Sequence, residues 1–241
     1  MALALASDFV VDEIGRYIKT PASVQPDRPR TSYIVVHHAA AIYAPGTACA
    51  AIFKVHSTRP DFTDYHRIGY HEVIQVEIGD LLRAHLVNPP LMQGAGVYGR
   101  NDVCYHICAA TNIVAIPDDG FVEALSQRVA AAKKRWPDAQ IVGHKEITLT
   151  GHGTACPGQL WAAWKPRLLK RVEALLAPPP RVWTVRAGIR GAIAQQDRRP
   201  DAPTAGVYFQ PGDLILVNDF TAGYYHVASE IGFVPAGQVL P

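Results

Sequence analysis

Three consecutive prolines at positions 178–180 place the strongest constraint on how this chain can fold. Proline fixes φ and lacks a backbone N–H, so such a run ends any helix and favours a stiff, extended spacer. Before the prolines, apolar side chains recur every three or four residues from Leu160 to Leu175, which predicts an amphipathic helix. We therefore expect an N-terminal domain over 1–177, a linker over 178–182 and a second domain over 183–241.

The N-terminal part alternates strand-like and helix-like segments. Its expected strands cover 33–37, 70–78, 102–110 and 140–143, and its expected helices cover 47–58, 120–136 and the segment before the prolines. Strands interleaved with helices predict an α/β domain with a central mixed sheet flanked by helices, with its core at about 30–175.

The C-terminal part is different in kind. Short strand candidates at 183–186, 213–217, 224–227 and 231–234 are separated by glycine-rich turns, and no helical periodicity appears. About 60 residues of this pattern predict a small all-β barrel.

Composition narrows the classes of function. A formal net charge of +2 over 241 residues gives no general attraction to nucleic acid or to an anionic membrane. No segment approaches the ~20 apolar residues that a transmembrane helix needs. The start, MALALA, lacks a basic region before its apolar run, so we expect no secretory signal and synthesis in a cytoplasm. Four cysteines do not make a disulfide framework.

Side chains that bind metals gather at three places: the His37-His38 pair at the end of a predicted strand, His144 at the end of another, and Cys156 before the long helix. Two imidazoles and one thiolate would form a tetrahedral zinc site with one position open for water. The separation of His37 and His144 along the chain fits no local ligand motif. Spacing alone therefore does not select these residues from the ten histidines.

Four ordered segments add to this picture: 33–40 (YIVVHHAA), 68–74 (IGYHEVI), 143–146 (GHKE) and 154–158 (TACPG). Together they resemble the signature of the N-acetylmuramoyl-L-alanine amidase family shared by phage endolysins and peptidoglycan recognition proteins. The resemblance covers roughly residues 30–175, and its specificity comes from the order of the matches.

The resemblance implies that His37, His144 and Cys156 are zinc ligands and that His38 is a supporting residue. It places Tyr70 beside the metal and Thr154 next to the developing oxyanion, as catalytic residues. Zinc would activate water to cleave the amide between N-acetylmuramic acid and L-alanine of the stem peptide. Tyr70 is the expected acceptor of the water's proton, with Glu146 as the alternative.

Some positions depart from the family pattern. The loop between His144 and Cys156 is long and carries an additional His152, which we expect to be a surface residue. Gly94 stands where many relatives have a histidine, and Cys49 lacks the partner cysteine that animal recognition proteins have. Two further cysteines, Cys104 and Cys108, are expected to be buried thiols on one face of a strand.

The segment 182–191 (VWTVRAGIRG) and the later strand candidates resemble bacterial SH3 domains. The resemblance implies an SH3-like, cell-wall-binding domain, in which Tyr224 and Tyr225 line a groove or pack the barrel. Tethering would raise the effective concentration of the catalytic domain at its polymer.

The family resemblance therefore predicts a zinc-dependent, phage-type endolysin, monomeric and cytoplasmic until its release to the cell wall, with bacterial peptidoglycan as its partner. Three alternatives stay open. The first is a bacterial autolysin or recycling amidase, and the second is a non-catalytic peptidoglycan-binding receptor. The third is a protein whose metal is purely structural, with His152 as the fourth ligand.

Overall fold

The computed structural model divides the chain into two compact units, residues 1–177 and 178–241. In the first unit it describes residues 3–17, 26–58 and 67–177, and in the second it describes the strands. The predicted linker, 178–182, lies outside the described residues. The first unit contains β1 (Ala4–Asp12), β2 (Tyr33–His38), α1 (Ala48–Thr58), β3 (Glu72–Glu77), β4 (Leu81–Leu86), η2 (Asn101–Val103), β5 (Cys104–Ala109), α2 (Asp119–Arg135), β6 (Gln140–Gly143), η3 (His144–Glu146) and α3 (Trp161–Leu176).

The six strands of this unit form one mixed sheet in the order β1-β4-β3-β5-β2-β6. β2 pairs in parallel with both β5 and β6, β3 pairs in parallel with β5, and β3 and β4 form an antiparallel pair. β2 lies between two strands, and its residues Ile34, Val35 and Val36 are fully buried. A strand covered on both faces needs such an unbroken apolar run. The predicted central mixed sheet flanked by helices is confirmed.

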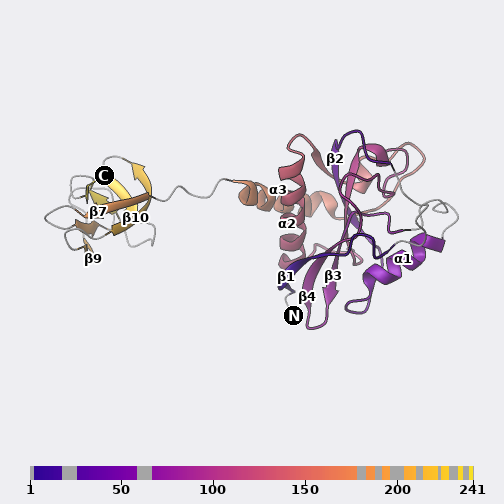
Figure 1. Cartoon of the computed structure of the whole chain (residues 1–241), viewed down its shortest axis with the longest axis horizontal. Coiled ribbons are helices and arrows are strands. Elements are labelled where there is room, and N and C mark those ends of the chain that lie inside the picture. The colour runs from indigo at the N-terminus through magenta and orange to yellow at the C-terminus, as the bar shows by residue number, and fades with distance from the viewer. Residues whose placement is uncertain are drawn as a thin grey trace. The chain divides into compact units, whose positions relative to one another are not determined.

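The two faces of the sheet carry different layers. In the first unit, Figure 1 shows α2 and α3 together on one side of the sheet and α1 on the other. Alternate residues of β2 and β5, such as Ile34 and Ile107, join Leu125 of α2 and Leu168 of α3 in the largest apolar cluster. The opposite face packs against α1 through Ile52.

Two strands of the sheet were not predicted. β1 lies in a segment for which no strand was expected, and it pairs in parallel with β4. β4 has the sequence LLRAHL, whose arginine and histidine break the apolar pattern expected of a strand inside a sheet. The predicted helices agree with α1, α2 and α3 to within one or two residues.

The second unit is a seven-stranded sheet in the order β13-β7-β10-β11-β12-β8-β9, and its recorded pairs are antiparallel. Its SH3-like character stays a prediction, and the side chains of Tyr224 and Tyr225 lie outside the described residues. The strands are β7 (Trp183–Ala187), β8 (Ala192–Gln195), β9 (Thr204–Phe209), β10 (Leu214–Thr221), β11 (Tyr224–Val227), β12 (Phe233–Pro235) and β13 (Val239–Leu240). Among the described residues, no helix has both the length and the apolar composition that crossing a membrane requires.

Candidate metal centre

His37, His144 and Cys156 come together at one edge of the sheet, with one ligand atom from each lying within 4.8 Å of the others. His37 is near the end of β2, and His144 directly follows β6. Because β2 and β6 are parallel neighbours, their carboxyl ends reach the same edge. Cys156 arrives from the loop that precedes α3.

The separations within the cluster suit a tetrahedral metal ion. Cys156 Sγ is 3.7 Å from His37 Nδ1, and the rings of His37 and His144 have centroids 4.8 Å apart. Zinc bonds of about 2.3 Å to sulfur and 2.0–2.1 Å to nitrogen would hold two tetrahedral ligands roughly 3.6 Å apart. Two imidazoles and one thiol therefore fit zinc in chemistry, and the separation of Cys156 from His37 is close to that of two tetrahedral zinc ligands.

Burial determines the protonation states of the three side chains in the cluster. His37 is 1% exposed and Cys156 8% exposed, whereas His144 is half-buried. Burial, with the neighbouring His144, holds the pKa of His37 well below its ordinary value, and burial lowers the pKa of His144 to about 4. Both rings therefore keep a neutral nitrogen lone pair at neutral pH. Burial raises the pKa of the Cys156 thiol to about 12, so a bound cation has to displace the thiol proton.

Backbone contacts fix the loop that carries Cys156. Its thiol accepts the backbone N–H of His38 at 3.3 Å, and its carbonyl accepts the N–H of Lys145 at 2.8 Å. A Cβ on Gly143 would lie 2.7 Å from both Cδ of Pro157 and Nε1 of Trp161, so the loop and α3 pack directly on the end of β6. Only glycine allows this close approach without a shift of the loop.

Tyr70 and Thr154 both lie beside the cluster. The ring centroids of Tyr70 and His37 are 5.1 Å apart. Burial, and then the nearby Cys108 and Cys156 thiols, raise the pKa of Tyr70 well above its ordinary value, so its hydroxyl stays protonated at neutral pH. Thr154 Oγ1 accepts the backbone N–H of Cys156 at 3.2 Å, which leaves its own hydroxyl hydrogen free to donate.

The neighbouring candidates lie apart from the three ligand atoms. His38 Nδ1 accepts the backbone N–H of Ile113 at 3.0 Å, which anchors a different loop. His152 is exposed and stacks on Tyr98 with centroids 4.0 Å apart. Glu146 accepts the N–H of Gly143 at 2.7 Å and pairs with Lys165 at 2.9 Å.

Sequence reasoning missed one residue of the site, His106. It is fully buried in β5, and its Nδ1 lies 3.0 Å from Nε2 of His37. The signal was a histidine inside the otherwise apolar strand CYHICA. The register that pairs Val35 with His106 brings it to the face of His37, and only the assembled sheet gives that register.

A second group of metal-type side chains, Glu13, Cys49 and His85, has different spacing. His85 Nδ1 is 2.8 Å from Glu13 Oε2, and His85 Nε2 is 2.8 Å from Glu77 Oε1. These separations are those of hydrogen bonds, and both ring nitrogens are engaged. The group is best described as a polar network that joins Glu13, just beyond β1, to β3 and β4.

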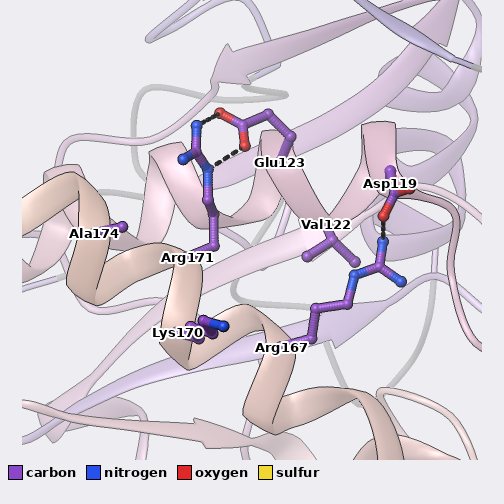
Figure 2. A pocket seen from close by; sticks show the side chains of 7 residues that line it. All are labelled: Asp119, Val122, Glu123, Arg167, Lys170, Arg171 and Ala174. Atoms are coloured by element: carbon purple, nitrogen blue, oxygen red, sulfur yellow. Dashed lines mark hydrogen bonds and ion pairs between the residues drawn. The ribbon is translucent and has the colours of Figure 1, made fainter. Parts of the chain in front are cut away.

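A hollow of about 360 Å³ lies between α2 and α3, on the sheet face opposite α1. Figure 2 shows two ion pairs at its walls, Arg171 with Glu123 and Arg167 with Asp119, on either side of the side chain of Val122. These charges neutralise one another across the two helices, and the three metal-type side chains do not line this hollow.

Comparison with known proteins identifies solved structures that share this fold. No protein-family model matches the sequence, and no curated protein matches it. Among solved structures, the Ph2119 endolysin from Thermus scotoductus MAT2119 bacteriophage Ph2119 is 24% identical with a TM-score of 0.51, over 68% of this chain and 98% of that chain. Drosophila PGRP-LB is 18% identical with a TM-score of 0.51, over 65% and 92%. PGRP-SA from Apis mellifera is 18% identical with a TM-score of 0.50, over 65% and 94%. The chain therefore shares the fold of a phage endolysin and of two insect PGRP proteins.

Proposed function

We propose that this chain is a zinc-dependent N-acetylmuramoyl-L-alanine amidase of the phage endolysin type. It would hydrolyse the amide that joins N-acetylmuramic acid to L-alanine of the peptidoglycan stem peptide. The observation that carries the proposal is the cluster of His37, His144 and Cys156, whose spacing suits zinc. The sequence motifs and the fold shared with a phage endolysin support it.

In the proposed mechanism, His37, His144 and Cys156 would hold the ion, which when bound would lower the pKa of a water molecule and polarise the amide carbonyl. His144 is half-buried, so it is the member of the cluster on the side nearest solvent. The hydroxyl of Tyr70, which its raised pKa keeps protonated, would donate to the oxygen that gains charge as the amide is attacked. The Thr154 hydroxyl donates to the same oxygen.

Glu146 has a supporting role in this mechanism rather than that of a base. Its carboxylate accepts the N–H of Gly143 and pairs with Lys165, so it holds η3 and α3 together next to His144. The raised pKa of Tyr70 keeps its hydroxyl protonated, so it is suited to donate to the developing oxyanion rather than to take the water's proton.

Within the second unit, residues 183–241 would form an SH3-like domain that binds the cell wall, and the linker 178–182 would join it to the first unit. A tether of this kind raises the local concentration of the first unit at peptidoglycan without any new catalytic contact. The proposed partner is peptidoglycan. We propose that the chain is made in a cytoplasm and is later released to the cell wall.

Drosophila PGRP-LB, which has the same fold, has been solved in complex with tracheal cytotoxin as a single-site variant.

Two alternatives make different predictions. A receptor without catalysis needs no complete ligand set, yet Cys156 is present and lies within the cluster. A purely structural metal requires a fourth protein ligand, but His152 is exposed and stacked on Tyr98. Both observations favour an open, catalytic ion.

The test is the digestion of purified peptidoglycan by the full chain, with free amino groups and reducing sugars measured separately. Zinc-loaded protein should release amino groups without reducing sugars, and both chelated protein and Cys156→Ala should release neither. His152→Ala is the matched control and should keep full activity. Wall binding by all samples with no cleavage would establish the receptor instead.

A further inference from the structure

His106 occupies a site that is built around its ring. A Cβ on Gly94 would lie 2.4 Å from Cδ2 of His106, and a Cβ on Gly96 would lie 2.6 Å from its Nδ1. Both glycines therefore let backbone approach the two edges of the imidazole. His71 stacks on its face, with centroids 5.5 Å apart and planes 14° from parallel. The ring has little freedom to turn.

The contact between His106 and His37 determines which nitrogen of His37 carries hydrogen. His106 Nδ1 and His37 Nε2 lie 3.0 Å apart, so one of them donates and the other accepts. If His37 Nε2 donates, the lone pair of His37 Nδ1 faces Cys156 Sγ at 3.7 Å. The reverse arrangement would put a hydrogen on His37 Nδ1, directed into the cluster, where it would block a metal ion.

The other nitrogen of His106 has an unusual environment. Nε2 is buried and has no hydrogen-bond partner among the described residues. An unpaired buried polar group costs free energy, whereas an apolar side chain would fill the same space without that cost. The contact of Nδ1 with His37 is therefore the feature that distinguishes histidine from an apolar residue at this position.

We propose that His106 is the positioning residue for His37: it accepts the Nε2–H of His37 and so directs the free Nδ1 lone pair at the zinc ion. This inference rests on the proposed zinc site. Partners of this kind fix the tautomer and the orientation of a ligating imidazole, and their loss typically weakens metal affinity about 10–100-fold.

The experiment compares zinc affinity, by competition with a chromophoric chelator, in the wild-type chain, His106→Leu and His106→Asn. Leucine removes the acceptor and should weaken zinc binding about 10–100-fold. Asparagine can place its amide oxygen near the position of Nδ1 and should recover most of that affinity. Cys104→Ala removes another buried side chain of β5. It should lower the melting temperature and leave zinc affinity unchanged.

A direct readout uses the wild type alone. Nitrogen-15 NMR of the zinc-loaded chain should show hydrogen on Nε2 of His37 and none on its Nδ1. Hydrogen on Nδ1, or a folded His106→Leu that binds zinc as the wild type does, overturns the inference and leaves the amidase proposal intact. A wild type that binds zinc with the expected dependence on His106 but cleaves no peptidoglycan supports the inference and refutes the amidase. A wild type that binds no zinc overturns both.

Discussion

Arg128 binds both carboxylate oxygens of Glu72, with Nε 2.6 Å from Oε2 and Nη2 3.1 Å from Oε1. The Glu72 side chain is only 2% exposed, and the hydroxyl of Tyr105 donates to it at 2.6 Å. Because Arg128 comes from α2 and Glu72 begins β3, this bidentate pair joins the helix layer to the sheet through a buried charge. Two parallel hydrogen bonds also fix the relative orientation of the two groups.

Replacing Arg128 with methionine should destabilise the first unit by about 3–5 kcal/mol, because it leaves the buried Glu72 carboxylate without its cation. Unfolding in urea measures the change. The double variant Arg128→Met, Glu72→Gln should recover much of the loss. Arg171→Met removes an exposed ion pair on the same helix layer and should have little effect. An equal loss from both single variants would show that burial of Glu72 is not the cause.

Replacing Gly143 with alanine should both destabilise the fold and weaken the metal site. The new Cβ would lie 2.7 Å from Pro157 and from Trp161, so the loop carrying Cys156 has to move. Overpacking of this kind costs about 1–3 kcal/mol. Melting temperature and zinc affinity measure the two effects. Gly153→Ala, in the same loop but with open space around its Cβ, is the control and should change neither.

Zinc should raise the melting temperature, because an ion held by His37, His144 and Cys156 binds the folded state. At free zinc one hundred times its Kd, the gain is about 2.7 kcal/mol. For a unit of this size, each kcal/mol corresponds to about 2–4 °C. Calorimetry with and without a chelator measures the shift. Cys156→Ser should reduce it strongly, and a shift that survives in this variant would place the ion elsewhere.

Stability should fall as the pH rises above about 9, because burial raises the pKa of Cys104 to about 12 and the pKa of Cys49 still further above its ordinary value. The folded state then holds these protons more tightly than the unfolded state, in which thiols ionise near pH 8.5. Below that pH the contribution is complete. Above it, each thiol costs up to about 1.4 kcal/mol per pH unit.

Urea unfolding between pH 8 and pH 11 tests this dependence. Cys104→Ala supplies the comparison, since it removes one thiol and should make the decline with pH less steep. An identical slope in the wild type and the variant would mean that Cys104 does not contribute to it.

The sheet was predictable where a segment's own sequence determines its burial. Ile34, Val35 and Val36 form a short, β-branched apolar run typical of a covered strand, and the predicted mixed sheet follows from such segments. β4 was missed because its polar residues find partners far away in sequence. Arg83 donates to Asp8 at 2.5 Å, and His85 Nδ1 lies 2.8 Å from Glu13 Oε2. No local pattern contains those contacts.

In the candidate site too, some residues could be predicted from the sequence and others could be found only in the assembled fold. The order of the family-like segments singled out His37, His144 and Cys156, and the structure brings them together. The exposure of His152 also agrees with the sequence-based expectation. His106 could not be assigned in advance, because its contact with His37 depends on the register between β2 and β5. The roles of Tyr70 and Thr154 stay predictions.

The separation of His37, His144 and Cys156 along the chain has a consequence for biosynthesis. A nascent chain has His37 early, but β6 and the Cys156 loop emerge only after most of the first unit has been made. High-affinity binding of the proposed zinc ion would therefore have to wait until β6 has docked beside β2 and the last loop has closed. Zinc binding during translation would therefore report that the first unit has finished folding. Chains truncated before residue 156 should not retain the ion.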